Sequence, residues 1–519
     1  MFKSLKRVFV VSLISVFAML YTGWSTSADV TAPTQGEQPN TPTLKLKVTD
    51  TSLGKIEGLI ATSLAVSPDS RHVAYAVQRG EKYVVVIDGI EGHEYDDIGA
   101  PGPVFSPDSK RVTYAARSGE KWVVVVDGVE GKGCDAMVAG SLIFSPDSRR
   151  VAYIAKRGEK LVVVVDGVEE KEYDGAGGLV FSPDSQRLTY AAQRGKKWFV
   201  VVDRVEEKEY DAIGIRGIIF SPDSKRVAYV ARRGEKWLIA VDGVDGKEYD
   251  AIGKDTPNFS PDSTHVAYYA QRGRKQYAVV DGIEGKEYDG IGSGTPIFSP
   301  DSKHVAYYAG REKKVVVVID GVEGKEYDGI GTPHIIFSPD SKRAAYLAQR
   351  GEKWIIVIDG GEGKEYDGIG ASGVVFSADS KRVAYYAQRD QKQFVVIDRV
   401  EGKAYDAIGI PGIIFSLDSK HIAYYAKRGE KWVVVVDGVE GKEYDDIGEG
   451  TLIFSPYTPR VAYYAQHGKK WVIPIDSVEG KEYYGFLKGS RLVFDSPNKL
   501  HGLTVRDGEI LLVEIEITE

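Results

Sequence analysis

Cysteine is nearly absent from this chain of 519 residues, and methionine and long apolar runs are scarce. The only thiol is that of Cys134, and there are three methionines. A single cysteine cannot form a disulfide within the molecule, so stability has to come from packing. After residue 24, no apolar run reaches the roughly 18 residues that a membrane-spanning helix needs. The bulk of the chain is therefore not predicted to cross a membrane.

The N-terminus differs from the rest of the chain. A basic segment, an apolar run over residues 8–24 and small residues up to Ala28 follow one another. This layout is typical of a secretory signal, so we predict a signal peptide over 1–28, with an uncleaved membrane anchor as the alternative. Residues 29–43 are rich in Pro, Thr and Gln and predict a flexible leader. We expect a periplasmic or secreted protein.

A strong charge of either sign is also lacking. The chain has 67 basic and 75 acidic residues and a net charge of −8, which becomes −11 when the three cations of the signal are removed. Mild acidity favours solubility and gives no reason to expect a nucleic-acid partner.

Apolar spacings of three and four, the mark of amphipathic helices, do not appear. Instead, Ser-Pro-Asp-Ser or a close variant begins eleven times, at steps of 39 residues with one step of 37. A degraded twelfth copy begins near Phe494. Such a fixed period indicates a repeat architecture. The eleven starts are Ser67, Ser106, Ser145, Ser182, Ser221, Ser260, Ser299, Ser338, Ser377, Ser416 and Ser455.

Each copy is predicted to contain four short strands. In one copy, residues 297–299 form a first apolar stretch, and 305–309 and 315–319 form two full strands rich in β-branched and aromatic residues. Asp320-Gly321 begins a hairpin turn, and a fourth short strand is expected at 326–328. Four strands in about forty residues is the period of propeller blades.

The third strands are apolar at every position, as in Trp122–Val126. This pattern predicts strands covered on both faces by neighbouring blades. Cys134 stands where most copies carry Tyr, and we interpret it as a buried packing residue. The tryptophans outside the signal share one repeat position, which favours packing between blades, with sugar binding by an aromatic ladder as the alternative. They are Trp122, Trp198, Trp237, Trp354, Trp432 and Trp471.

The unit Phe-Ser-Pro-Asp-Ser-Lys-Arg-Val-Ala-Tyr resembles the WD40-like repeat of TolB-type propellers, the PD40 class, over about residues 60–519. The resemblance implies the blade fold and an envelope setting. Two departures stand out. The family's usual turn is Ser-Pro-Asp-Gly, whereas this chain has Ser at the last position, and TolB carries an α/β domain before six blades that has no counterpart here. The partners of TolB are therefore not carried over.

The two ends of the repeat region are complementary. Residues 44–60 resemble the last part of a repeat, and 492–515 supply the first three strands of one. Joined, they predict a twelfth blade closed by both termini, which removes exposed sheet edges. We therefore predict an all-β propeller of about twelve four-stranded blades over residues 44–519. The lack of a linker near the midpoint favours a single large ring, with two six-bladed rings as the alternative, since propellers usually have four to eight blades.

Catalytic and metal-binding motifs are missing as well. Gly-x-Ser-x-Gly does not occur, and no helix is expected after Gly368–Gly373, which matches a dinucleotide-binding pattern. The repeated acids lack the spacing of a calcium loop. We expect no cofactor, no metal and no catalysis but a binding or scaffolding role, with a carbohydrate-binding propeller and a propeller-based enzyme as alternatives. Four histidines share a repeat position that Arg fills elsewhere, which argues against metal ligands: His72, His265, His304 and His421.

Charge placement gives the candidate interaction surface. In antiparallel blades, the turn between the second and third strands lies on one face of the ring, which we call the first face. The other two turns lie on the second face. First-face turns are basic and the hairpins from Asp-Gly to Tyr-Asp are acidic, which predicts two faces of opposite charge.

A ring of like charge steers an oppositely charged partner. We therefore expect an acidic protein or an anionic glycan on the first face, and discs of opposite faces could also stack. The alternative is that these are solvated turn residues copied with the repeat. The candidate residues are Arg157, Arg194, Lys196, Lys197, Arg233, Arg272, Arg274, Lys275, Lys313 and Lys314.

Overall fold

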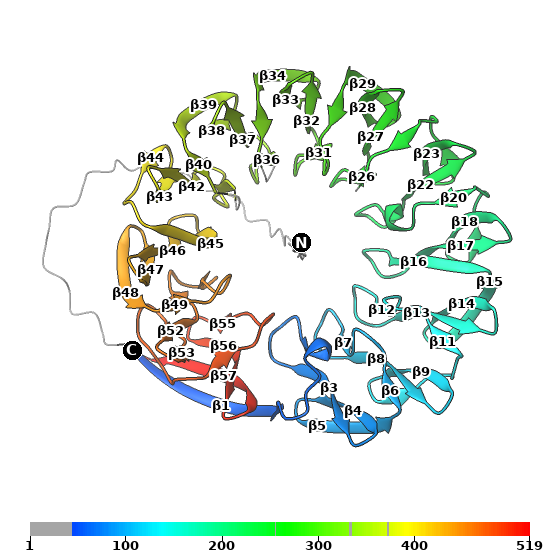
Figure 1. The fold of residues 1–519 in the computed structure, drawn as a ribbon, viewed down its shortest axis with the longest axis horizontal. Helices are drawn as coiled ribbons and strands as arrows, with labels where there is room; N and C mark the ends of the chain where they lie inside the picture. Colours follow the sequence, from blue (N-terminus) through cyan, green and yellow to red (C-terminus); the bar gives the residue numbers. More distant parts are fainter. Residues whose placement is uncertain (1–43, 255, 332–334, 371–372, 519) are drawn as a thin grey trace, which may run out of the picture. The chain divides into compact units, whose positions relative to one another are not determined.

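A computed structural model describes residues 44–254, 256–331, 335–370 and 373–518. Its strands form twelve blades arranged in one ring, a twelve-bladed β-propeller (Figure 1). The prediction of a single large ring is confirmed. The predicted signal peptide, 1–28, and leader, 29–43, lie outside the described residues.

Blade 7 illustrates the repeat. Its innermost edge has two short strands, β30 (Gly290–Ile291) and β31 (Ile297–Phe298), which both pair with β32 (Val305–Arg311). The sheet continues outward with β33 (Lys314–Ile319) and β34 (Val322–Tyr327). Figure 1 shows these strands in order from the centre of the ring to its rim.

The outermost strand begins earlier than the sequence predicts. Asp320 and Gly321 both have positive φ, 52° and 78°, as a two-residue hairpin turn requires, so β34 starts at once at Val322. The predicted fourth strand is present, but its predicted start at Glu326 is wrong, because Glu326 and Tyr327 are the last two residues of β34. Gly329–Ile330 (β35) already belongs to blade 8, where it pairs with β37 (Ala344–Arg350).

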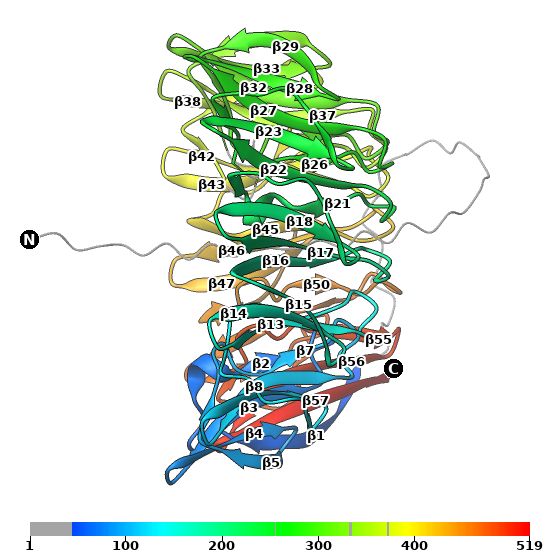
Figure 2. The same cartoon turned by 90° about the vertical axis from the view of Figure 1, so that its right-hand side faces the viewer.

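The core lies between the blades rather than within them. The third strand β33 is buried at its three central residues, and one apolar cluster joins Val317 and Tyr327 of blade 7 to Tyr346 and Val357 of blade 8. The middle strands of each blade are therefore covered on both faces, one face by each neighbouring blade, as the apolar third strands predict. Seen edge-on, the blades stack side by side around the ring (Figure 2).

Blade 12 is built from both ends of the described chain. β1 (Lys45–Lys55) pairs in antiparallel fashion with β57 (Glu509–Thr518), which continues through β56 (Lys499–Arg506) to the inner strands β54 (Gly485–Phe486) and β55 (Val493–Ser496). The predicted closure by both termini is confirmed. β1 thereby covers the edge of β57, which would invite aggregation if it were left unpaired.

Candidate interaction surface

The ten predicted basic residues lie at the turns between second and third strands, on the first face. Seven of them form ion pairs, and six have N–O distances of 2.6–2.9 Å, while Arg157 also pairs with Glu169. Among the described residues, Lys196, Arg274 and Lys313 have no ion-pair partner and are exposed. The six pairs are Arg194–Glu206, Lys197–Asp211, Arg233–Asp245, Arg272–Glu284, Lys275–Asp289 and Lys314–Asp328.

The paired lysines hold an aspartate that joins consecutive blades. Lys314 donates to Oδ1 of Asp328 at 2.7 Å, and the backbone amide of Gly351 in blade 8 donates to Oδ2 at 2.7 Å. The Lys314 contact, followed by the Gly351 amide, lowers the pKa of Asp328. An equivalent aspartate accepts a backbone amide of the next blade at ten described junctions.

The paired arginines take part in a second contact between blades, on the rim, in which a glutamate accepts a tyrosine of the preceding blade; we call this contact the clasp. Glu323 of β34 accepts from Lys286 and Tyr288 of blade 6, at 2.9 and 2.7 Å, and from Arg311 of its own blade at 2.7 Å. These contacts, with Lys286 the largest, lower the pKa of Glu323 to about 2. Charge-assisted bonds of this kind are about twice as strong as neutral ones. The tyrosine member is buried and repeats around the ring.

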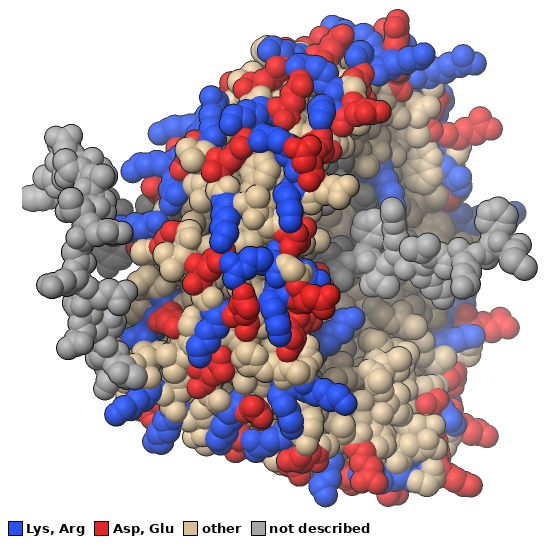
Figure 3. Space-filling view, turned by 60° about the vertical axis from the view of Figure 1, so that its left-hand side comes forward, with Lys and Arg blue, Asp and Glu red and all other residues tan. Residues whose placement is uncertain are grey.

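These contacts overturn the predicted separation of charge between the faces. The hairpin from Asp-Gly to Tyr-Asp is not a turn on the second face but strand β34 and its equivalents, which cross the rim from one face to the other. The Tyr-Asp ends therefore lie beside the basic turns and neutralise them. Figure 3 shows Lys and Arg mixed with Asp and Glu over the outer surface.

A different contact joins the blades on the second face. Ser302, the last residue of its Ser-Pro-Asp-Ser turn, has φ 65° and its Oγ accepts the backbone amide of Asp262 in blade 6 at 2.9 Å. The same bond occurs at nine described junctions, and at the seam the amide of Arg491 bonds Ser70. The hydroxyl explains why this chain departs from the Ser-Pro-Asp-Gly turn.

The repeated histidines take part in the same structural scheme. Nδ1 of His304 lies 2.7 Å from Asp320 of its own blade, and its ring stacks on Phe337 of the next blade with centroids 6.4 Å apart. Arg343 makes the corresponding contacts with Asp359 and Phe376. Within the described part of the chain, no group of three His, Cys, Asp or Glu is arranged to hold a metal ion.

All six tryptophans are half-buried and five of them pack into the apolar clusters, which supports packing over sugar binding, while the ring of Trp237 lies under the guanidinium of Arg232. Trp122 also borders a cavity of about 460 Å³ with Pro101, Met137 and Leu142. That lining offers few polar groups to a sugar. Cys134 is 1 % exposed, which confirms the buried packing residue.

Gly368–Gly373 has a packing role. Gly368–Ile369 is strand β40, and a β-carbon on Gly370 would lie 1.6 Å from Cζ of Tyr386. Glycine is required there by the tyrosine ring, and the next element that the structure describes is strand β41 (Val375–Phe376), not a helix. The dinucleotide-like pattern is thus a consequence of blade packing.

The sequence analysis missed the residues that join the blades, namely the aspartates held by lysines and the glutamates that accept the tyrosines. The signal was present, because Lys at the start of the third strand and Tyr-Asp at the end of the fourth recur together in most copies. Reading the acids as turn residues concealed their pairing across strands.

Comparison with solved structures finds other propeller proteins. TolB from Acinetobacter baumannii is 18 % identical over 42 % of this chain and 64 % of its own, with a TM-score of 0.23. The propeller domain of the Trilobed protease from Pyrococcus furiosus is 15 % identical over 51 % of this chain and 97 % of its own, with a TM-score of 0.25. The repeats have the TolB-type propeller fold.

Other propellers have different activities. A GH74 enzyme from Niastella koreensis is 11 % identical over 90 % of this chain and 92 % of its own, with a TM-score of 0.26. At such identities the likeness of this TolB-type propeller to each of them concerns the fold alone. No family model and no curated protein matches the chain. Among the described residues, no helix is long and apolar enough to cross a membrane.

Proposed function

We propose that this TolB-type propeller is a non-catalytic binding scaffold of the cell envelope or secreted space, and that its first face binds an acidic partner. The observation that carries the proposal is that three of the ten predicted basic residues, Lys196, Arg274 and Lys313, are exposed and have no ion-pair partner among the described residues. The basic residues beside them are paired within the ring, so these three remain available to a ligand.

The three cations lie at the tips of turns between second and third strands, in blades 4, 6 and 7. The equivalent tip of blade 11 carries a further exposed lysine, Lys469. The equivalent tips of blades 1, 2, 3, 5, 8 and 10 carry glutamate: Glu81, Glu120, Glu159, Glu235, Glu352 and Glu430. A partner with an acidic segment would therefore approach blades 6 and 7, where two cations are adjacent, and be repelled by the tips that carry glutamate.

The segments that join the two innermost strands of each blade add specificity at the inner edge of the ring. They are the part of the repeat that differs most between copies, as in Ile215 of blade 5, Lys254 of blade 6 and Ser293 of blade 7, which are all exposed. Near-identical blades with a variable segment at the inner edge suit recognition of a partner better than an asymmetric active site. The secretory N-terminus supports an envelope or extracellular setting.

The test is a cross-linked pull-down from envelope extract with a variant that reverses only the three free cations to glutamate. Paired residues such as Arg194 and Arg272 are left intact, because they hold neighbouring strands together. A matched control makes the same charge change on the second face, at three lysines whose side chains are 78–82 % exposed: Lys225, Lys303 and Lys342.

A partner that binds the native protein and the control but not the first-face variant supports the proposal. That binding should weaken as salt rises, since exposed charges are screened. Equal capture by all three proteins refutes the assignment of the first face. Loss of the partner from the second-face control, with retention by the native protein and the first-face variant, would place the surface on the second face.

A further inference from the structure

Ten described junctions are filled by a tyrosine of the outermost strand. Tyr288 of blade 6 packs edge-on against Tyr307 of blade 7, with ring centroids 6.2 Å apart, and donates its hydroxyl to Glu323 at 2.7 Å. The guanidinium of Arg311 lies 5.6 Å from the centre of the same ring. The receiving blade thus offers a phenol three groups: an aromatic edge, a carboxylate and a cation. The other hydroxyl donors are Tyr95, Tyr173, Tyr210, Tyr249, Tyr327, Tyr366, Tyr405, Tyr444 and Tyr483.

The seam between blade 12 and blade 1 has the receiving groups without the tyrosine. Leu53 of β1 is buried and packs against Tyr75, as Tyr327 packs against Tyr346 at a regular junction. Leucine is shorter than tyrosine and has no hydroxyl. The hydroxyl of Tyr75 turns to the carbonyl of Lys55 at 3.0 Å.

The acceptor carboxylate at the seam is correspondingly open. Glu91 pairs with Arg79 at 2.6 Å, and among the described residues no phenol or lysine of blade 12 contacts it. The side chain of Glu91 is 48 % exposed, against 25 % for Glu323 at a regular junction. Tyr75, Arg79 and Glu91 therefore repeat the three receiving groups, but no tyrosine of blade 12 lies between them.

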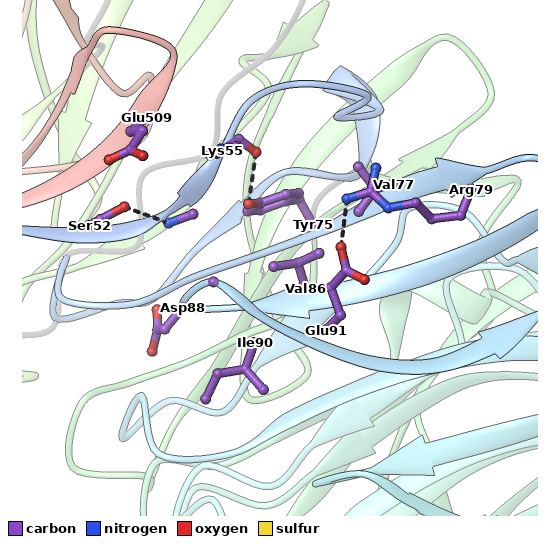
Figure 4. Close-up of a pocket in the computed structure, with 12 residues that line it drawn as sticks. Ser52, Lys55, Tyr75, Val77, Arg79, Val86, Asp88, Ile90, Glu91 and Glu509 are labelled. Carbon is purple, nitrogen blue, oxygen red and sulfur yellow. Dashed lines mark hydrogen bonds and ion pairs between the residues drawn. The ribbon is translucent and has the colours of Figure 1, made fainter.

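A cavity of about 430 Å³ occupies this place, lined by the three receiving groups and by Val86 and Ile90 (Figure 4).

We infer that the seam cavity is a binding site for a phenol group, either the side chain of a tyrosine on another polypeptide or a free phenolic molecule. The ring lies between the apolar side chains of Val86 and Ile90 and the edge of Tyr75. Its hydroxyl donates to Glu91, and Arg79 lies over its face. This site is on blade 1 at the rim and does not depend on the acidic partner proposed for the first face.

The test uses the purified full chain with two probes, N-acetyl-tyrosinamide and p-cresol, and N-acetyl-phenylalaninamide as the probe without a hydroxyl. Binding is measured by ligand-observed NMR titration. A small ligand at an open site should bind with a Kd of about 1 mM. The phenylalanine probe should bind at least about fivefold more weakly, because it cannot bond the carboxylate.

Two variants distinguish this site from general adsorption. Leu53→Tyr supplies the chain's own phenol and should abolish binding of both phenols while raising the melting temperature, so loss of fold cannot explain the result. Glu91→Gln should keep the fold and weaken phenol binding. Cys134→Tyr, at a different junction, should leave it unchanged.

Binding of both phenols, lost in Leu53→Tyr, supports the site and identifies a free phenol as sufficient. Binding of the tyrosinamide alone, lost in the same variant, supports the site and identifies a tyrosine of a polypeptide. Absence of binding by either phenol, or binding unchanged in Leu53→Tyr, overturns the inference. None of these outcomes depends on the partner of the first face.

Discussion

Replacement of Ser302 by alanine and by glycine separates two opposing effects in the Ser-Pro-Asp-Ser turn. The Oγ of Ser302 accepts the amide of Asp262 across the junction at 2.9 Å, which we expect to contribute about 1 kcal/mol. The backbone of Ser302 has φ 65°, a conformation that costs a residue with a β-carbon about 1 kcal/mol and glycine almost nothing. Alanine therefore loses the bond and keeps the strain, whereas glycine loses both.

We expect Ser302→Ala to lower the free energy of unfolding by about 1 kcal/mol, and Ser302→Gly to stay within about 0.5 kcal/mol of the native protein. Urea unfolding gives the difference between the two variants, and hydrogen exchange detected by mass spectrometry reports on the amide of Asp262. That amide should exchange faster in both variants, since both lack the acceptor. Glycine more destabilising than alanine, or unchanged exchange at Asp262, would refute the reasoning.

Three further predictions concern the contacts between blades. Cys134→Tyr should raise the melting temperature by filling the junction and bonding Glu169, whereas Cys134→Ala should lower it; a lower melting temperature for the tyrosine variant contradicts the clasp. Because the folded-state pKa of Glu323, about 2, lies below the unfolded value, its carboxylate stabilises the ring above about pH 4, and this contribution is lost as the pH falls toward 2. Glu323→Gln should therefore flatten the dependence of the urea midpoint on pH in that range. Deletion of residues 44–55 should expose the edge of β57 and cause association in size-exclusion chromatography, and a peptide of that segment should reverse it.

The ring was predictable because its determinants are local and repeated. Eleven in-phase turns and four strand patterns per copy define the blade, and the complementary ends predict blade 12. The number of rings followed from the uniform spacing and the missing linker. These signals depend on residues close together in the sequence, where strand and turn preferences act directly.

The candidate surface was only partly predictable, because charge in the sequence does not show which charges are paired. Arg272 and Lys275 look identical in kind to Arg274, yet the first two pair with Glu284 and Asp289 and the third has no partner among the described residues. The pairing depends on where the outermost strand begins. A strand that starts directly after Asp-Gly carries its acids across the rim to the basic turns.

The seam also could not be read from sequence similarity alone. The segment after Gly54 resembles the end of a repeat, which places Glu57 at the tyrosine position. In the structure, β1 pairs Asp50 with Val513, and the buried Leu53 takes that position instead. The regular outermost strands have an irregularity at the corresponding place in their pairing with the third strand, whereas β1 pairs with β57 without interruption from Asp50 to Ser52. Its register therefore differs from theirs.

The near-identity of the junctions has a consequence for how the number of blades is controlled. A contact between two regular blades contains no information about its place in the ring, so any copy could follow any other. Only β1 and β57, whose sequences differ from the repeat, form a unique pair that ends the count. The circumference is thus determined by the number of copies encoded between these two strands. Duplication or loss of one 39-residue unit would change the diameter of the ring while leaving every regular contact and the closing pair intact.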